Sequence, residues 1–194
     1  MFDLNKLAAE IHAAAVEKGF WDVEDAESKH IAKMISELGE IIQADRAGVM
    51  YEIEREGAKP EGVIAEMADF VMMTLDLAMH DDMMDVIKDG MKDAEKDMEY
   101  ALTHRKDVHT LDELKKLYAS YPVYRLVISS ANCVFEASGY ASPLSSKTNC
   151  FEDFGYMIYA FTVWCSEHGY DLWDVIRQKM EYNKSRPALH GRLY

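Results

Sequence analysis

Four acidic residues occur as two pairs with the same spacing, and each pair lies inside a hydrophobic stretch. Glu37 and Glu40 are three residues apart in "ISELGEIIQA", residues 35–44. Glu66 and Asp69 repeat that spacing in "EGVIAEMADFVMMTLDLA". Residues three apart are neighbours on a helix, so each pair places two carboxylates side by side. Carboxylate oxygens suit Mg²⁺ or Mn²⁺ better than zinc, so the sequence predicts one hard divalent cation held by all four residues.

Both acidic pairs fall on stretches whose apolar residues recur with helical spacing. With about 100° of rotation per residue, the first stretch forms an apolar stripe of Ile31, Met34, Ile35, Leu38, Ile41 and Ile42. The second forms a stripe of Ile64, Met67, Ala68, Val71, Met72 and Leu75. Each acidic pair then lies on its own face, beside the core. The short connection predicts an antiparallel hairpin, in which the facing carboxylates repel one another unless a cation binds.

The rest of the chain is also rich in helix formers. Only four prolines and ten glycines interrupt its 194 residues, and Ala, Glu, Lys, Leu and Met fill the intervals. Thr110 followed by Glu113 is a capping box, and Pro60 precedes a helix start at residue 61. We therefore predict an all-α fold with helices over 3–18, 26–47, 61–79, 83–102, 111–119, 123–138, 149–168 and 172–184.

Composition and charge narrow the class of partner. The net charge of −14 disfavours a nucleic-acid backbone, whose phosphates require a basic face. The apolar runs are too short for a membrane span, and no signal peptide opens the chain. Cys133, Cys150 and Cys165 are odd in number and lack close spacing. We expect buried reduced thiols and a cytoplasmic location.

The acidic pattern resembles the MazG-like family within the all-α nucleoside triphosphate pyrophosphohydrolases. Two further stretches carry the resemblance. "KGFWD", residues 18–22, is similar to the segment that precedes the first acidic helix in that family. "KMEYNKSRPALHGRLY", residues 179–194, is similar to its basic C-terminal signature. The resemblance spans the chain, with a gap between about residues 103 and 147.

The resemblance implies a reaction and a set of roles. A nucleoside triphosphate would be cleaved between its α and β phosphates, giving a monophosphate and pyrophosphate. The four carboxylates would hold Mg²⁺ (or Mn²⁺), and either Glu37 or Glu40 would orient or deprotonate the attacking water. The substrate-binding residues would be Trp21, Lys33, Lys179, Asn183, Lys184 and Arg186. Lys179, Asn183, Lys184 and Arg186 would contact phosphate oxygens, and Trp21 would stack on a base or pack in the core.

A weak internal repeat divides the chain. "IAEMADFVMMTLDLA" aligns with "CFEDFGYMIYAFTVW", which pairs Glu66 with Glu152 and Asp69 with Gly155. "MISELGEIIQA" aligns with "VISSANCVFEA", which places Ser130 at Glu37 and Cys133 at Glu40. We therefore predict two helical modules, 1–106 with the metal motif and 107–194 as a degenerate copy that supplies the basic tail.

Two other classes of protein also place acidic residues on helices. In a non-catalytic helical scaffold the acidic faces would simply be solvated. A di-iron carboxylate protein needs Glu-x-x-His pairs, of which Glu27-x-x-His30 is the candidate, with other histidines such as His12 and His80 expected at the surface.

Two aromatic-rich stretches of the sequence bear on how the protein assembles. The stretches 123–138 and 149–168 are rich in aromatic residues, namely Phe135, Phe151, Phe154, Tyr156, Tyr159, Phe161 and Trp164. Because one chain would have difficulty covering so much apolar surface, we expect a homodimer, as the resemblance also implies.

Overall fold

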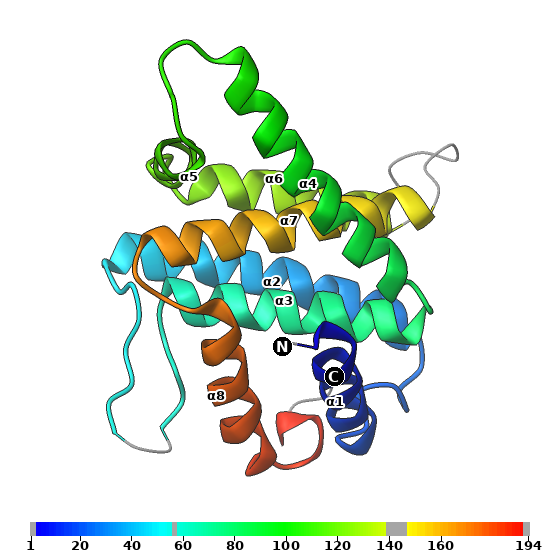
Figure 1. Ribbon diagram of the computed structural model, residues 1–194. Helices are drawn as coiled ribbons and strands as arrows, with labels where there is room; N and C mark the ends of the chain where they lie inside the picture. The colour runs from blue at the N-terminus through cyan, green and yellow to red at the C-terminus, as the bar shows by residue number, and fades with distance from the viewer. Residues whose placement is uncertain (1–2, 56–57, 139–146, 192–194) are drawn as a thin grey trace. The chain divides into compact units, whose positions relative to one another are not determined.

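The fold is known from a computed structural model that describes residues 3–55, 58–138 and 147–191, with side chains up to Leu189. It confirms the all-α prediction (Figure 1). The helices are α1 (Leu4–Glu17), α2 (Ala26–Ala47), α3 (Val63–His80), α4 (Met84–His104), α5 (Leu111–Ala119), α6 (Tyr124–Ala137), α7 (Lys147–Glu167) and α8 (Leu172–Lys184), followed by the 3-10 helix η1 (Ala188–Gly191). Within the described ranges no strand forms, and pairing of extended backbone is limited to an isolated bridge between Glu52 and Glu61. None of the described helices is long and apolar enough to cross a membrane.

Local sequence signals account for most helix ends. Each predicted end lies within two residues of the observed one. Thr110 Oγ1 accepts a hydrogen bond from the Glu113 N–H at 3.2 Å, as a capping residue should. The start of α3 is the informative exception, because it begins at Val63 instead of residue 61. The Val63 and Ile64 N–H groups donate to the carbonyls of Val49 and Met50, both at 3.0 Å, so the loop backbone caps the helix and sets its first residue.

The chain forms two compact units, which are not the two predicted modules. Unit 1 contains residues 1–84 and 173–194, and unit 2 contains residues 85–172. The predicted boundary lay at residue 106. The difference arises because α8, with the basic tail, packs in unit 1, whereas most of α4 belongs to unit 2. Whether the modules descend from a repeat stays a prediction.

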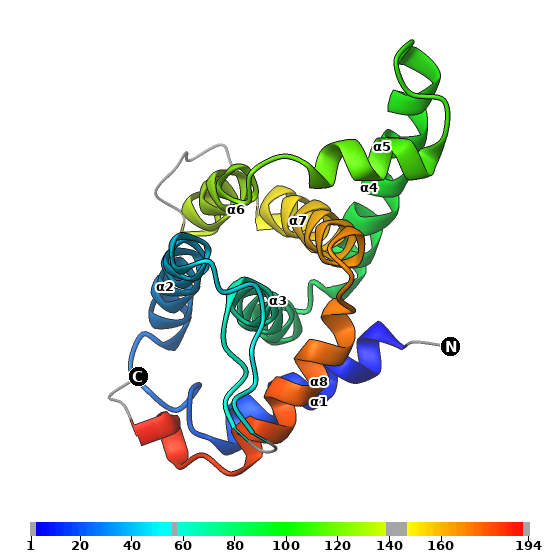
Figure 2. The ribbon, with the colours of Figure 1, turned by 90° about the vertical axis from the view of Figure 1, so that its left-hand side faces the viewer.

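In unit 1, α3 is the central helix. Both α1 and α2 pack against it, and α2 and α3 lie side by side in opposite directions (Figures 1 and 2). Nearly every side chain of α3 is buried, polar ones included. The predicted stripe on α2 holds for Ile31, Met34, Leu38 and Ile41, which are buried. Ile35 is 56% exposed, so its assignment to the core was wrong. It follows Met34 by one residue and is therefore rotated about 100° away from the buried face.

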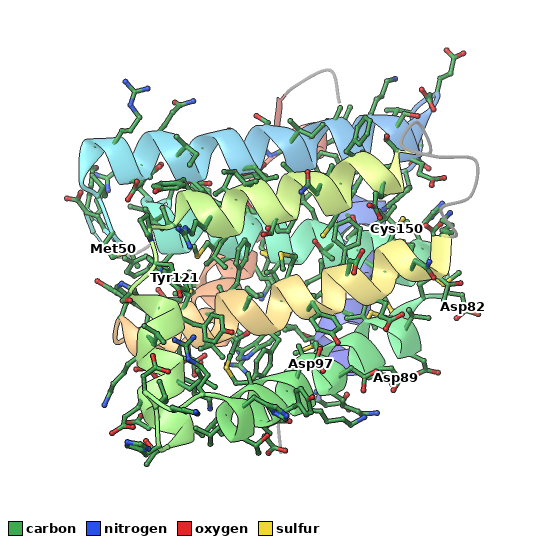
Figure 3. All side chains as sticks on the ribbon, turned by 90° about the horizontal axis from the view of Figure 1, so that it is seen from above. Met50, Asp82, Asp89, Asp97, Tyr121 and Cys150 are labelled. Atoms are coloured by element: carbon green, nitrogen blue, oxygen red, sulfur yellow. The ribbon has the colours of Figure 1, made fainter. Side chains whose placement is uncertain are left out.

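In unit 2, α7 is the element that α5 and α6 pack against. A close backbone approach joins it to α4, because a Cβ on Gly155 would lie 2.4 Å from the Ile87 carbonyl oxygen. Further along, Tyr156 Oη donates to Asp97 Oδ2 at 2.9 Å, and Asp97 is labelled on α4 in Figure 3. The three cysteines are buried thiols that form no disulfide within the described residues, as predicted.

The aromatic residues behind the homodimer prediction do not form one exposed surface. Phe151, Phe154, Phe161 and Trp164 are buried. Phe135 is 57% exposed, and on the same helix Ile128 and Tyr124 are also exposed. The homodimer stays a prediction that rests on a smaller apolar surface than the sequence suggested.

Candidate metal centre and adjoining pocket

Three of the four predicted metal ligands meet between α2 and α3. Glu37 and Glu40 come from successive turns of α2, and Glu66 comes from the first turn of α3. One carboxylate oxygen from each residue lies within 4.8 Å of the other two. This all-oxygen cluster is the donor set that a hard divalent cation prefers.

Burial makes the cluster costly for the protein alone. Glu37 is 7% exposed and Glu66 is 3% exposed, so both lie in the core and not beside it as the stripe predicted. Desolvation, followed by the charge of Asp69, raises the pKa of Glu37 to about 8. Desolvation likewise raises the pKa of Glu66 to about 7, against the opposing effect of Lys179. Among the described residues, none donates a hydrogen bond to the buried Glu66 Oε2. An oxygen without a hydrogen-bond donor, among carboxylates that resist ionisation, fits a site that a cation completes.

The fourth predicted ligand, Asp69, is engaged by a lysine. Lys179, on α8, is 2% exposed. Its Nζ donates to Asp69 Oδ2 and, at 2.9 Å, to the carbonyl of Ala65. The same ammonium lies 3.5 Å from Glu66 Oε2. The sequence assigned Lys179 to phosphate oxygens, but the structure directs its charge into the acidic cluster, where it holds Asp69 and Glu66 in place.

The cluster opens onto a large cavity within unit 1. Glu37, Glu40 and Asp69 line a cavity of about 940 Å³ whose other walls come from α1, α8 and the tail. Lys59, from the loop before α3, also lines it. Its Nζ lies 3.7 Å from Glu66 Oε1, so the cluster has a second cationic neighbour that the sequence analysis missed. The volume is ample for a metal-bound ligand of nucleotide size.

Four of the predicted substrate-binding residues line this cavity, namely Lys33, Asn183, Lys184 and Arg186. Lys33 Nζ lies 4.9 Å from the centre of the Phe20 ring, a cation–π contact. Arg186 donates to Asn183 Oδ1 at 3.3 Å. The Lys184 ammonium is bound to Glu181 instead.

The two stretches that carry the family resemblance, residues 18–22 and the C-terminal stretch from residue 179, contact each other in the structure. Lys18, the first residue of "KGFWD", donates from Nζ to the carbonyls of Lys184 at 3.1 Å and Arg186 at 2.5 Å. In return, the Leu189 N–H donates to the Lys18 carbonyl at 2.8 Å. Lys18 thereby fixes the tail at the cavity, a role without a sequence signal. Residues 192–194 of the predicted signature lie outside the described residues.

Trp21 belongs to a polar and aromatic group around Asp76. Its ring stacks on those of His80, at a centroid distance of 3.8 Å, and His30, at 5.1 Å. Its Nε1–H donates to Asp76 Oδ1 at 3.1 Å. His12 Nδ1 lies 2.6 Å from the same oxygen, so His12, which was expected at the surface, is partly buried against Asp76. The structure thus uses Trp21 to hold Asp76 and the histidines.

Asp76 was overlooked, and His30 was considered only as a di-iron ligand, although the sequence contained a signal that places both beside the acidic pairs. His30 lies seven residues before Glu37, and Asp76 lies seven residues after Asp69. Seven residues are close to two helical turns, so each falls on the same helix face as its metal-site neighbour. Both line the cavity together with the carboxylates.

Comparisons of the chain with protein-family models, with curated proteins and with solved structures found no match.

Proposed function

We propose that the protein is a Mg²⁺-dependent nucleoside triphosphate pyrophosphohydrolase of the MazG-like type. The supporting observation is the carboxylate cluster of Glu37, Glu40 and Glu66, which lies at the wall of a cavity with basic side chains. Anionic ligands and a cluster of carboxylates are compatible in one cavity only when a cation lies between them.

Within this proposal, Glu37, Glu40 and Glu66 hold the metal, and Asp69 contributes from the same wall. The metal, when bound, neutralises phosphate charge and polarises the attacked phosphorus. Lys179 keeps Asp69 and Glu66 oriented through its hydrogen bond and ion pair, so we give it a positioning role instead of a phosphate contact.

The attacking water needs a carboxylate to orient it or accept its proton. Glu37 and Glu40 both line the cavity, and either meets that requirement. Ser36 Oγ donates to Glu40 Oε1 at 3.4 Å, which leaves the second oxygen of Glu40 for a ligand or water. The variants Glu37→Gln and Glu40→Gln distinguish the proton acceptor from a metal ligand. Loss of the proton acceptor lowers kcat and shifts its pH profile, whereas loss of a metal ligand raises the Mg²⁺ concentration required for activity.

Lys33, Asn183 and Arg186 are the proposed phosphate ligands. The guanidinium of Arg186 is suited to a bidentate grip on phosphate, and Lys18 holds the tail that carries it. Lys184 would have to leave Glu181 to take part, so we rank it below the other three.

The alternative classes fit the geometry less well. A scaffold with a solvated acidic face does not account for the burial of Glu37 and Glu66. In a di-iron protein, His30 would join the carboxylates. Its Nε2 is instead 2.8 Å from the Met73 carbonyl, and its Nδ1 is beside Asp76.

Pyrophosphate release from a panel of ribo- and deoxynucleoside triphosphates tests the proposal. We expect release with Mg²⁺ and none with EDTA, and we expect Glu40→Gln to be strongly impaired. Mg²⁺ should also raise the thermal midpoint of the wild type but not of Glu40→Gln, since a ligand that binds only the folded state stabilises it. Absence of pyrophosphate release from every triphosphate in the presence of Mg²⁺ would refute the proposal.

A further inference from the structure

A second polar site lies in the cavity, away from the metal centre. It consists of the Asp76 carboxylate and the His30 imidazole, whose side chains are 5% and 8% exposed. Both residues line the cavity that also contains Glu37 and Asp69. A carboxylate this deeply buried must have its hydrogen-bonding capacity used, either by the protein or by a ligand.

Among the described residues, hydrogen-bond donors reach one oxygen of Asp76 and not the other. Oδ1 accepts from the Trp21 Nε1–H at 3.1 Å and pairs with His12 Nδ1 at 2.6 Å. Oδ2 has the Nδ1 atom of His30 as its neighbour at 3.7 Å, which is beyond hydrogen-bond distance. Two donors therefore hold the carboxylate through Oδ1, and Oδ2 belongs to a residue that lines the cavity.

The hydrogen bond of His30 decides what its other nitrogen presents. Nε2 lies 2.8 Å from the carbonyl oxygen of Met73, which can only accept, so Nε2 carries the proton. In a neutral imidazole, Nδ1 is then an acceptor. Burial lowers the pKa of His30 and outweighs the raising effect of Asp76, which favours this neutral form. Two acceptors, Asp76 Oδ2 and His30 Nδ1, therefore face each other at 3.7 Å.

Two acceptors this close together need a hydrogen-bond donor that reaches both. A group with one hydrogen satisfies one of them, whereas an amino group with two hydrogens satisfies both. A carbonyl oxygen in the same place would be a third acceptor and would leave all three unpaired, which is costly in a buried site.

The distance to the metal centre identifies what carries this group. Asp76 lies seven residues beyond Asp69 on α3, and His30 lies seven residues before Glu37 on the antiparallel α2. At 1.5 Å per residue, both steps displace the acceptor pair by about 10 Å from the carboxylates, in the same direction. A nucleotide has a similar reach from its α-phosphate, across the sugar, to the edge of its base.

We propose that Asp76 Oδ2 and His30 Nδ1 bind the exocyclic amino group of a nucleobase, so that the protein selects cytosine or adenine nucleotides over their oxo counterparts. Trp21 and His12 are positioning residues that fix the carboxylate. This inference rests on the proposed function for its nucleotide, but it concerns recognition and not hydrolysis.

Calorimetric titration with nucleoside monophosphates tests the inference separately from catalysis. The ligand pairs are dCMP against dUMP and dAMP against dIMP, because the members of each pair differ by amino for oxo. We expect the amino member of at least one pair to bind at least about 100-fold more tightly to the wild type, since unpaired buried acceptors penalise the other.

The matched variants are Asp76→Asn and Asp45→Asn. The first keeps an oxygen for Trp21 and His12 but replaces an acceptor by a donor, so the preference should fall to about tenfold or less. The second removes an exposed carboxylate on α2 and should keep the wild-type preference.

Equal binding within both pairs in the wild type would overturn the inference, and this result needs no variant to fold. An equal loss for both members of a pair in Asp76→Asn would also overturn it. Amino-selective binding without pyrophosphate release would uphold the inference and refute the proposed function. Hydrolysis of all the nucleoside triphosphates with the same kcat/KM would support the proposed function and overturn the inference.

Discussion

The α2–α3 pair in unit 1 and the α6–α7 pair in unit 2 are both packed helix pairs, and they treat corresponding positions differently. In the first pair, the weak sequence repeat places Glu37, Glu40, Glu66 and Asp69. In the second, the same alignment places Ser130, Cys133, Glu152 and Gly155. Glu37 and Glu66 are buried, whereas Glu152, the one acid of the second set, is exposed.

The second pair satisfies its polar groups locally. Ser130 Oγ donates to the Leu126 carbonyl at 2.9 Å, and Cys133 Sγ donates to the Ser129 carbonyl at 3.3 Å. The first pair instead buries charges that need outside compensation, from Lys179 and, in our proposal, from a metal. A helix pair that serves only for packing avoids the cost of burying carboxylates. The buried carboxylates of α2–α3 therefore point to a function.

Removal of one acidic residue from each helix pair tests this difference most directly. Glu66→Gln should lower kcat/KM by about 1,000-fold, because a metal ligand supplies several kcal/mol of transition-state stabilisation. Glu152→Gln makes the same change at an exposed position and should leave activity within about twofold. Steady-state kinetics on the best substrate gives both values. A large loss in Glu152→Gln with none in Glu66→Gln would place the active site in unit 2.

The pH dependence of stability should differ between the pairs in the absence of metal. The pKa of Glu37 rises from 4.5 to about 8 on folding, so the folded protein binds an extra proton between these values and loses stability as the pH rises through them. Glu37→Gln should remove a decline on the order of 4 kcal/mol from the free energy of unfolding. Urea unfolding in EDTA from pH 5 to pH 8 measures it, with Glu152→Gln as the control. A decline of equal size in Glu37→Gln and wild type would contradict the assignment.

Lys179 should matter more to stability than an exposed lysine. Lys179→Met leaves Asp69 and Glu66 without their buried cation and should destabilise the metal-free protein by about 3 kcal/mol. Lys92→Met removes an exposed partner of Asp89 on α4 and should cost less than about 1 kcal/mol. Chemical unfolding at pH 7 compares the two. Similar small losses in both would show that the acidic cluster does not depend on Lys179.

The smallest predicted effect concerns why the second pair lacks an acid at residue 155. A Cβ there would lie 2.4 Å from the Ile87 carbonyl oxygen, so Gly155→Ala should destabilise by about 2 kcal/mol. A Cβ on Gly39, within α2, would meet nothing within 4 Å. Gly39→Ala should therefore be neutral or stabilise by up to about 1 kcal/mol, since alanine is the better helix former. Thermal melts of both variants decide the point, and a neutral Gly155→Ala would remove packing as the reason for this glycine.

Much of the candidate site was predictable from its spacing. The i, i+3 acidic pairs and the periodic stripes located both helices and brought Glu37, Glu40 and Glu66 together, because a helix hairpin leaves few alternatives. Asp76 and His30 were also accessible through their seven-residue steps from Asp69 and Glu37. Asp76 was passed over because a lone acid on a helix has no chemical pattern of its own, and His30 was considered only together with Glu27.

The helices, their approximate ends and the grouping of Glu37, Glu40 and Glu66 were predictable, since they depend on propensity, periodicity and residues close along the chain. Contacts between distant helices were needed to show that α8 completes unit 1, that Lys179 points into the carboxylates, and that Trp21 holds Asp76. The same contacts explain why Ile35 is exposed while Glu37 is buried. Each of these depends on which distant helix covers a given face, and the free energy of that packing comes from contacts that local sequence does not specify.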